Sequence, residues 1–280
     1  FWKNKKVLIT GHTGFKGSWL SLWLDHLDAE LIGFSNSIPT NPSLFEGLKN
    51  QEKMISINGD IQKYDDLKNV ISEFKPEIIF HLAAQSLVNH SYQNPLETYS
   101  TNVMGTVNIL EVIRETKIPK ILINVTSDKC YKNIESLKGK TELDELGGYD
   151  PYSNSKACAE LITDSYRNSF FNNSEFLKHG IAISSVRAGN VIGGGDWAEN
   201  RLIPDIFRGI MNNNEIKIKN PESIRPWQHV LDPLNGYMVL AEKLWNNGPK
   251  FSEAWNFGPT EDEPKTVRWV LDKINQYWGK

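Results

Sequence analysis

The chain has 280 residues, enough to bury the core of one large domain or of a main domain with a smaller lobe. Its formal net charge is −3, and because lysines and arginines form no block, the composition does not indicate a nucleic-acid or membrane-surface partner. No apolar run approaches the ~20 residues that span a bilayer. The two cysteines, Cys130 and Cys158, have neither metal-ligand nor disulfide spacing. These features predict a soluble cytoplasmic protein without a metal site.

The N-terminal sequence predicts a strand, a glycine turn and a helix in succession. Residues 7–10 form a short apolar run, glycines follow at positions 11, 14 and 17, and an apolar segment continues to residue 27. Glycines permit a tight turn and close backbone approach, so the first N–H groups of the helix can hold a pyrophosphate. The spacing G-x-x-G-x-x-G favours a loop of the short-chain dehydrogenase type. The expected cofactor-binding residues of this loop are Gly11, His12, Thr13, Gly14, Phe15 and Gly17.

The end of the second predicted strand leaves the choice between NAD and NADP open. Residues 31–34 form this strand, and residues 35–37 (Ser-Asn-Ser) stand where NAD-selective sites commonly carry an acid for the adenosine ribose. This segment has no arginine for an extra phosphate either. His12 and Lys16 of the glycine loop either favour that phosphate or contact the pyrophosphate or solvent.

Two further predicted strands end in residues suited to cofactor contacts. The third, at residues 54–58, is followed by Asp60 and Ile61, where the acid either accepts from the adenine amino group or belongs to a plain turn. The fourth, at residues 78–80, continues into a segment whose small side chains let the backbone lie against the cofactor. The expected contacts there are Leu82, Ala83, Ala84 and Gln85.

A helix is predicted next, because Val103, Val107, Leu110 and Ile113 share one helical face. Asn102 lies in the same helix, and an amide beside an apolar stripe needs hydrogen-bond partners. Asn102 is therefore either merely structural or a tie between the cofactor strand and the active-site helix.

The fifth predicted strand, at residues 121–125, ends in Thr126, Ser127, Asp128 and Lys129. In open parallel α/β sheets, ligands bind at the carboxyl ends of the strands. These four residues bring hydroxyl groups, a carboxyl group and an amine to that edge, so we predict that they are catalytic.

A second set of candidate catalytic residues opens the following helix. The Asp-Pro pair at residues 150–151 predicts the helix start, which places Tyr152 in the first turn and Lys156 one turn later on the same face. An ammonium group near a phenol favours the phenolate, so we expect Lys156 to lower the pKa of Tyr152 from about 10. Tyr64 and Lys68 have the same spacing, but we predict a solvated helix face there.

The second half of the chain predicts a ligand loop and a less regular lobe. A sixth strand at residues 181–186 leads into a loop in which Asn190, Asp196 and Trp197 flank three successive glycines. After it, helices are predicted at 204–210, 234–245 and 267–278, and strands at 216–218 and 254–257. Arg225 is suited to clamp a phosphate, and Trp227 or His229 to line the pocket, unless this segment is a surface strand. We divide the chain into a Rossmann-like domain at 1–187 and an interleaved substrate lobe at 188–280.

These motifs together resemble the extended short-chain dehydrogenase/reductase family, and within it the nucleotide-sugar 4,6-dehydratases. The glycine loop and the Tyr-x-x-x-Lys pattern identify the superfamily, whereas residues 126–129 and 189–197 point to the dehydratases. The resemblance implies an α/β fold with a doubly wound parallel sheet, NAD as cofactor and CDP-glucose as substrate. The implied substrate-binding residues are Gln85, Asn190, Asp196, Trp197, Arg201, Arg225 and His229.

The resemblance also implies a reaction: oxidation at C4 of the sugar, loss of water across C5 and C6, and return of the hydride to C6. Tyr152 would take the proton of the 4-hydroxyl, with Lys156 holding the phenol and Thr126 or Ser127 hydrogen-bonding O4. Related dTDP-glucose dehydratases carry Asp-Glu at the position of Asp128 and Lys129. We therefore expect Asp128 to be the acid for the 6-hydroxyl and Lys129 to be the C5 base, or an enolate stabiliser if it stays protonated.

The family further implies a homo-oligomer, a dimer or tetramer, built on the helices that begin near Leu96 and Tyr152. It also implies a closing segment beyond Lys280, so we expect an incomplete substrate lobe. Two alternatives remain. Another 4,6-dehydratase or a 4-epimerase would share the fold, but an epimerase has no need for the Asp128–Lys129 pair. A dinucleotide-sensing binding protein would often lack the tyrosine or the lysine, and this chain has both.

Overall fold

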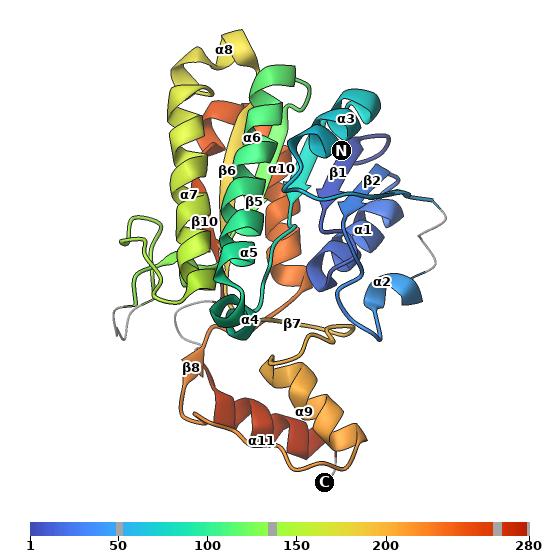
Figure 1. Ribbon diagram of the computed structural model, residues 1–280, viewed down its shortest axis with the longest axis vertical. Coiled ribbons are helices and arrows are strands. Elements are labelled where there is room, and N and C mark those ends of the chain that lie inside the picture. The colour runs from blue at the N-terminus through green and yellow to red at the C-terminus, as the bar shows by residue number, and fades with distance from the viewer. Residues whose placement is uncertain (49–52, 134–138, 260–264, 279–280) are drawn as a thin grey trace.

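The computed structural model describes residues 1–48, 53–133, 139–259 and 265–278. Its centre is a seven-stranded parallel sheet with the strand order β10-β6-β5-β4-β1-β2-β3 (Figure 1). The strands are β1 (Lys6–Thr10), β2 (Glu30–Ser35), β3 (Ile55–Asn58), β4 (Ile78–His81), β5 (Ile121–Val125), β6 (Ala182–Ala188) and β10 (Ala254–Phe257). This is the predicted doubly wound Rossmann-like fold.

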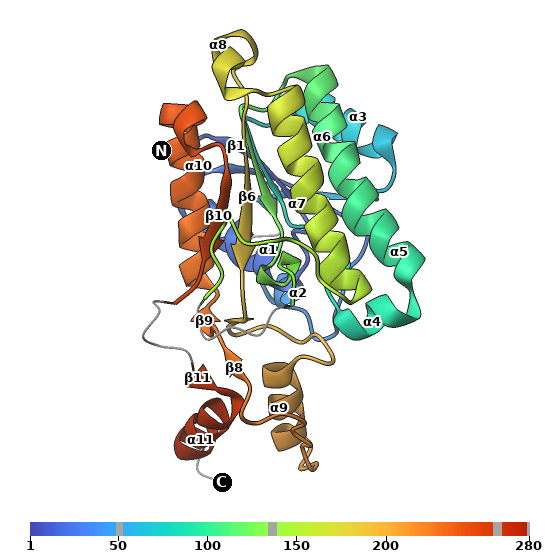
Figure 2. The same ribbon diagram turned by 90° about the vertical axis from the view of Figure 1, so that its left-hand side faces the viewer.

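Helices cover both faces of the sheet. The main ones are α1 (Phe15–His26), α3 (Tyr64–Phe74), α6 (Gly105–Thr116), α7 (Pro151–Ser169) and α10 (Leu231–Phe251). The shorter helices are α2 (Leu44–Gly47), α4 (Val88–Gln93), α5 (Pro95–Tyr99), the π-helix η2 (Ser100–Met104), the 3₁₀ turns η3 (Asp128–Cys130) and η4 (Asn173–Glu175), and α8 (Phe176–His179). Figure 2 shows α10 on one side of the strands and α6 and α7 on the other.

The alternation of side chains along the strands divides the core between the two faces. Val7 and Ile9 of β1 pack with α1 and α10, whereas Leu8 between them packs with α3 and α6. Because side chains of a strand point alternately to opposite faces, a strand covered by helices on both sides must be apolar throughout. The buried runs in β4 and β5 follow the same rule.

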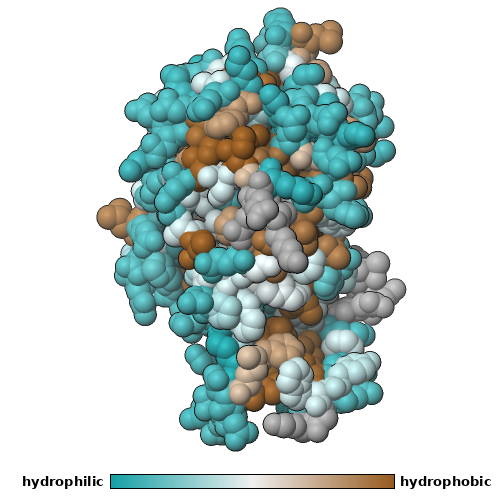
Figure 3. All heavy atoms as spheres, turned by 90° about the vertical axis from the view of Figure 1, so that its right-hand side faces the viewer, coloured by the Kyte–Doolittle hydropathy of each residue, from teal (hydrophilic) through white to brown (hydrophobic). Residues whose placement is uncertain are grey.

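A smaller lobe lies beyond the carboxyl ends of the strands (Figure 1). It contains α9 (Leu202–Met211), α11 (Val267–Trp278), the pair β8 (Ile224–Arg225) with β11 (Lys265–Thr266), and the pair β7 (Val191–Ile192) with β9 (Gln228–His229). Phe207 of α9 and Trp278 of α11 meet edge to face, 5.6 Å apart. Hydrophobic atoms are also exposed on the lobe in Figure 3. α10 and β10 follow residue 188 in the sequence but belong to the part of the protein built on the central sheet. The predicted division of the chain into two domains at residue 187 therefore stays a prediction.

Two sequence predictions of secondary structure are wrong in detail. Residues 216–218 form no strand: they have no ladder partner, and the Ile216 side chain covers Gly209 of α9. The predicted buried face of the helix, which included Val103 and Val107, also differs from the observed buried face. Both are only half-buried, while Ile109, Leu110 and Ile113 are fully buried. The π-helical turn that precedes α6 is wider than an α-helical turn and so rotates the buried face.

No helix in the described segments has both the length and the apolar character needed to cross a membrane.

Candidate active site

The glycine loop lies against the end of β4. Gly11 has a φ of +75°, and a Cβ there would lie 2.8 Å from the backbone nitrogen of Ala83. A Cβ on Gly17 would lie 2.1 Å from the carbonyl oxygen of Gly11. Only glycine fits at these positions. The compact turn leaves the N-terminus of α1, capped by Gly14, at the carboxyl edge of the sheet. This arrangement fits a dinucleotide pyrophosphate.

His12 of this loop points into the protein. Its ring nitrogens hydrogen-bond the hydroxyls of Ser35 at 2.9 Å and Ser56 at 2.8 Å, and its ring fills the space above Gly33. Burial lowers the pKa of His12 to about 4. The side chain is therefore neutral near pH 7 and offers no positive charge to a phosphate. The prediction that His12 attracts an extra phosphate, or contacts the pyrophosphate or solvent through its side chain, does not match this placement.

Asp60 and Ile61 follow β3 as predicted, and their contacts are local. The carboxylate of Asp60 accepts a 2.9 Å hydrogen bond from the backbone of Gln62, which closes a turn. The side chain of Ile61 occupies the space that a Cβ on Gly105 would need. The plain-turn alternative accounts for these contacts of Asp60.

Asn102 joins the cofactor strand to the active-site helix. Its side chain accepts from the backbone N–H of Gln85 at 2.8 Å, donates to the Gln85 carbonyl at 2.9 Å, and donates to the Ser155 hydroxyl at 2.8 Å. The Gln85 amide is itself held by Leu87 and Thr98. The structure thus favours the second of the two roles predicted for Asn102.

Tyr152 and Lys156 open α7 as the sequence indicates. Asp150 caps the helix by accepting from the backbone N–H of Ser153 at 2.9 Å. Tyr152 is 8% exposed and Lys156 6% exposed, and the ammonium group of Lys156 donates to the carbonyl of Val125 at 3.3 Å. Both side chains therefore lie at the end of β5.

The charge environment of Tyr152 differs from the expectation. Burial raises the pKa of Tyr152, and hydrogen bonding to the Ser127 hydroxyl and the charge of Arg201 only partly oppose this. The expected lowering of this pKa by Lys156 is therefore wrong, because desolvation of the phenolate outweighs nearby positive charge. Burial also lowers the pKa of Lys156 to about 8.

The four residues after β5, at positions 126–129, have different surroundings. Thr126 donates its hydroxyl to Glu160 and also lies 3.2 Å from the carbonyl of Val186, so it faces inward. Ser127 hydrogen-bonds Tyr152 and donates to Asp128 at 3.2 Å. A Cβ on Gly189 would lie 2.9 Å from the Asp128 carboxylate, which therefore packs closely on the chain after β6.

Lys129 is exposed. The described protein groups thus do not supply the desolvation that a lysine base near neutral pH requires. Lys16 of α1 is an additional cation near these residues, although the sequence pattern suggested a contact with the cofactor alone. Burial, and then the charge of Arg201, lower the pKa of Lys16 to about 8, and Asp128, Lys129 and Lys156 also act on it.

The glycine-rich loop after β6 packs on α1 and reaches the lobe. Trp19 donates to the carbonyl of Gly194 at 2.9 Å, and Gly195 has a φ of +83°. Arg201 forms an ion pair with Asp196 at 3.1 Å and donates to the hydroxyl of Ser86 at 3.0 Å. This contact joins the lobe to the segment after β4.

The other predicted substrate-binding residues lie around this loop but do not form a single cluster. The backbone carbonyls of Asn190 and Trp197 accept from Gln228 at 3.1 Å and Arg208 at 2.7 Å. Arg225 and His229 are exposed on β8 and β9, and His229 contacts the edge of Trp19. Arg201 therefore lies next to the segment after β4, whereas the exposed Arg225 side chain donates to the carbonyl of Ile224 at 2.7 Å on the surface of the lobe.

Sequence analysis missed the buried ion pair between Glu160 and Arg187, whose charged atoms lie 2.8 Å apart. Glu160 falls four residues after Lys156, which is the spacing that places two side chains on one helix face, and this signal could have identified it.

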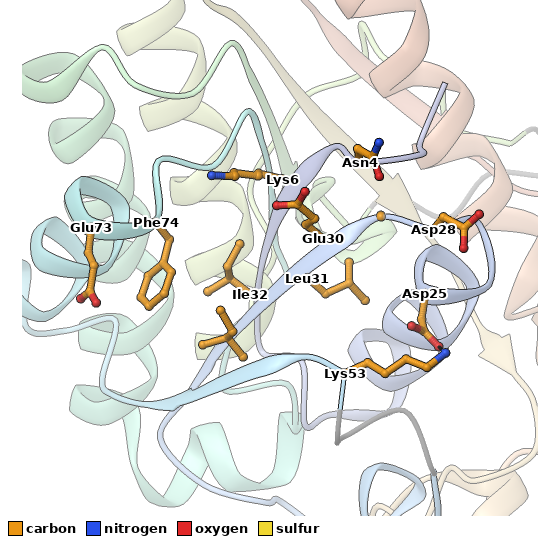
Figure 4. Close-up of a pocket in the computed structure, with 12 residues that line it drawn as sticks. Asn4, Lys6, Asp25, Asp28, Glu30, Leu31, Ile32, Lys53, Glu73 and Phe74 are labelled. Carbon is orange, nitrogen blue, oxygen red and sulfur yellow. Dashed lines mark ion pairs between the residues drawn. The ribbon is translucent and has the colours of Figure 1, made fainter.

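A separate hollow of 560 Å³ lies at the opposite, amino edge of the sheet (Figure 4). Asp25, Asp28, Glu30 and Glu73 line it with Lys6 and Lys53, and Lys53 pairs with Asp25 at 3.6 Å. Ligands of parallel α/β sheets bind at the carboxyl edge instead, so we do not assign this hollow to the active site. The described residues also contain no cluster of three or more His, Cys, Asp or Glu side chains suited to a metal.

Comparison with known proteins decides the family. The sequence profile described as GDP-mannose 4,6 dehydratase matches residues 8–247. The chain belongs to this family. CDP-glucose 4,6-dehydratase of Salmonella typhimurium is 57% identical over 279 residues, which cover 100% of this chain and 78% of that protein. The predicted membership of the epimerase/dehydratase group is confirmed.

Solved structures of this group share the fold. A dTDP-glucose 4,6-dehydratase from Bacillus anthracis, in complex with NAD, superposes with a TM-score of 0.80 at 24% identity, covering 99% of this chain and 81% of that one. A UDP-glucose 4-epimerase from Thermotoga maritima gives 0.81 at 21% identity, covering 98% and 82%. At these identities the likeness concerns the fold alone.

Proposed function

We propose that this chain converts CDP-glucose to CDP-4-dehydro-6-deoxy-glucose with NAD as its cofactor. The observation that carries the proposal is the position of Asp128 and Lys129 directly after β5, next to Ser127 and Tyr152. Oxidation at C4 alone, as in an epimerase, has no use for this additional acid and amine. The 57% identity to a CDP-glucose 4,6-dehydratase supports the choice of reaction and nucleotide.

The residues that would hold NAD are those of the glycine loop, with Ala83 and Ala84 at the end of β4. The steric room left by Gly11 and Gly17 supports this assignment. When bound, NAD supplies the redox chemistry, because it accepts a hydride from C4 and gives it back at C6. His12 is neutral and committed to Ser35 and Ser56, so it favours no additional phosphate.

Tyr152 would remove the proton of the 4-hydroxyl as C4 is oxidised. Its raised pKa means that it needs positive charge to act as a base. Arg201 already lowers this pKa in part, and we assign Lys156 the same role. Ser127 would hydrogen-bond O4. Thr126, the other candidate for this contact, donates its hydroxyl to Glu160 and is therefore less suited.

The elimination step needs a base at C5 and an acid at O6. The 4-ketone acidifies the C5 proton, which Lys129 would remove, while Asp128 would protonate the 6-hydroxyl so that it leaves as water. Because Lys129 is exposed, it can act as a base only if the bound substrate and the neighbouring cations favour its neutral form. A protonated Lys129 would instead stabilise the enolate.

The residues around the glycine-rich loop would bind the nucleotide part of the substrate. Arg201 is best placed for its phosphates, since its guanidinium already joins Asp196 of the glycine-rich loop to Ser86 after β4. Arg225 and His229 would contact the substrate from the lobe. We further propose a cytoplasmic homo-oligomer, a dimer or tetramer, that acts in deoxysugar and lipopolysaccharide biosynthesis.

The test is incubation of the purified protein with catalytic NAD and, separately, CDP-, dTDP-, UDP- and GDP-glucose. We expect the alkaline absorbance of a 4-keto-6-deoxy sugar with CDP-glucose only. Product from another nucleotide would overturn the substrate assignment, and a 4-epimer would overturn the reaction. If the chain bound NAD but converted no sugar nucleotide, a dinucleotide-sensing role would replace the enzymatic one.

A further inference from the structure

A buried carboxylate lies behind the candidate catalytic residues. Glu160 is on α7, one turn after Lys156, and its side chain is 2% exposed. One oxygen accepts from the hydroxyl of Thr126, and the other accepts from Ser185 at 2.6 Å and from Arg187 at 2.8 Å. These bonds, from Thr126 just after β5 and from two residues of β6, satisfy the buried carboxylate.

The partner cation, Arg187, has further hydrogen bonds, although its buried Nε has no partner in the described residues. Arg187 also donates to the Tyr131 hydroxyl at 2.8 Å and to the carbonyl of Glu142 at 3.2 Å. Tyr131 in turn donates to Asn256 of β10 at 2.6 Å. The network therefore extends from the end of β5 to the edge strand of the sheet, and it holds Glu160 in one position.

Among the described residues, Glu160 is the acidic side chain whose charge acts on Lys156. Burial lowers the pKa of Lys156, and Glu160 is the main group that opposes this effect. The other titratable groups that interact with Lys156 are Cys130 of η3, His81 of β4 and Lys16 of α1. Cys130, with its pKa raised to about 12, and His81, with its pKa lowered to about 3, are both neutral at pH 7. Lys16 carries the same sign as Lys156.

We propose that Glu160 is a positioning residue for the C4 oxidation, which keeps Lys156 in its ammonium form and turns the Thr126 hydroxyl away from the substrate. This inference rests on the proposed function, because Lys156 matters as a cation only if Tyr152 acts as the base. The same carboxylate explains why Ser127, rather than Thr126, reaches the phenol.

The test separates the charge of Glu160 from its contribution to folding. In Glu160→Gln, we expect the titration of Lys156 to move down by about one pH unit, because an opposite charge nearby raises an amine's pKa by at least that much. The titration is followed by NMR of lysines labelled at the ε-carbon, with the Lys156 signal assigned by Lys156→Met. The alkaline limb of kcat/KM should move down in parallel.

Three further variants act as controls. Ser185→Ala removes a hydrogen bond to Glu160 but retains its charge, and Asp164→Asn removes a carboxylate one turn further along α7. Neither should move the Lys156 titration. Glu160→Gln alone leaves Arg187 buried without its partner, which destabilises the fold. The double variant Glu160→Gln/Arg187→Gln replaces both charges and should recover stability in urea, which shows how much of the single variant's loss comes from the unpaired Arg187.

The outcomes are distinct. A lowered Lys156 titration in Glu160→Gln but not in the Ser185 and Asp164 variants, with stability recovered in the double variant, supports the positioning role. The role is overturned if Lys156 titrates in Glu160→Gln as it does in the wild type, or if Ser185→Ala, which retains the charge of Glu160, lowers the Lys156 titration equally. A shifted titration in a protein that converts no sugar nucleotide would leave the charge coupling in place and reject the proposed function.

Discussion

The side-chain amide of Asn102 donates a 2.8 Å hydrogen bond to the hydroxyl of Ser155, and so joins the π-helical turn before α6 to the helix that carries Tyr152. The same amide exchanges two hydrogen bonds with the backbone of Gln85, after β4. The segment expected to contact the cofactor and the helix expected to hold the catalytic phenol are therefore positioned by one side chain.

Replacement of Asn102 by alanine should lower the stability of the fold. It leaves the backbone N–H and carbonyl of Gln85 without partners in a half-buried segment, so we expect a loss of about 2–4 kcal/mol in the free energy of unfolding. Asn108→Ala removes two hydrogen bonds to the carbonyls of Ile61 and Gln62 and is a matched control, with an expected loss of about 1 kcal/mol. Urea unfolding measures both. Equal losses in the two variants would contradict a special role for Asn102.

Tyr152→Phe should lower kcat by about 10²- to 10⁴-fold, because it removes the group proposed to take the 4-hydroxyl proton. The control is Tyr64→Phe, which alters the other Tyr-x-x-x-Lys pair. Tyr64 donates to Glu115 on the exposed surface of α3 and α6, as the predicted solvated face requires, and its loss should leave kcat unchanged. Substantial activity in Tyr152→Phe would remove this residue from the base role.

Lys129→Ala tests the elimination step. If Lys129 removes the C5 proton, the variant should retain NAD binding but lose exchange of the C5 hydrogen with deuterated solvent. Lys132→Ala is the control, since Lys132 is three residues further on and pairs with Glu145 at 2.9 Å. Exchange at the wild-type rate in Lys129→Ala would mean that another group is the base.

Stability should fall on acidification because of two buried histidines. Burial lowers the pKa of His12 to about 4 and of His81 to about 3, from 6.5. The unfolded chain therefore binds more protons than the folded one below pH 6.5, and folding loses about 2 kcal/mol per histidine by pH 5. The loss continues until about pH 4 for His12 and about pH 3 for His81.

Urea midpoints at pH 7.5, 6 and 5 measure this dependence. His12→Asn should remove about half of the loss, whereas His26→Asn, at an exposed position, should leave it unchanged. A wild-type stability that is equal at pH 7.5 and pH 5 would contradict the account of both histidines.

Local sequence patterns predicted much of the fold, because the apolar runs of the sheet and the start of α7 depend on neighbouring residues. The strand at 121–125 and the helix at 267–278 were located correctly to the residue. The strand predicted at 216–218 was wrong, because strand formation needs a partner and none of the described strands pairs with these residues. The predicted buried face through Val103 and Val107 was wrong, because a π-helical turn changes the helical period and has no clear signal in the sequence.

For the candidate site, the sequence indicated which residues lie at the carboxyl edge but not which way they point. Thr126 and Ser127 are adjacent hydroxyls, and only the contact with Glu160 distinguishes them. Whether the pKa of Tyr152 is raised or lowered also depends on burial, which the spacing of residues along a helix does not reveal. His12 was misplaced for the same reason, since its partners Ser35 and Ser56 come from two other strands.

The most direct test of the proposed reaction follows the hydride itself. CDP-glucose deuterated at C4 is incubated with the protein and catalytic NAD, and the product and the nucleotide pool are examined by NMR and mass spectrometry. The account predicts that the deuterium appears at C6 of a 4-keto-6-deoxy sugar, with no net accumulation of reduced cofactor. Deuterated NADH formed in proportion to the substrate, with no deuterium at C6, would contradict it.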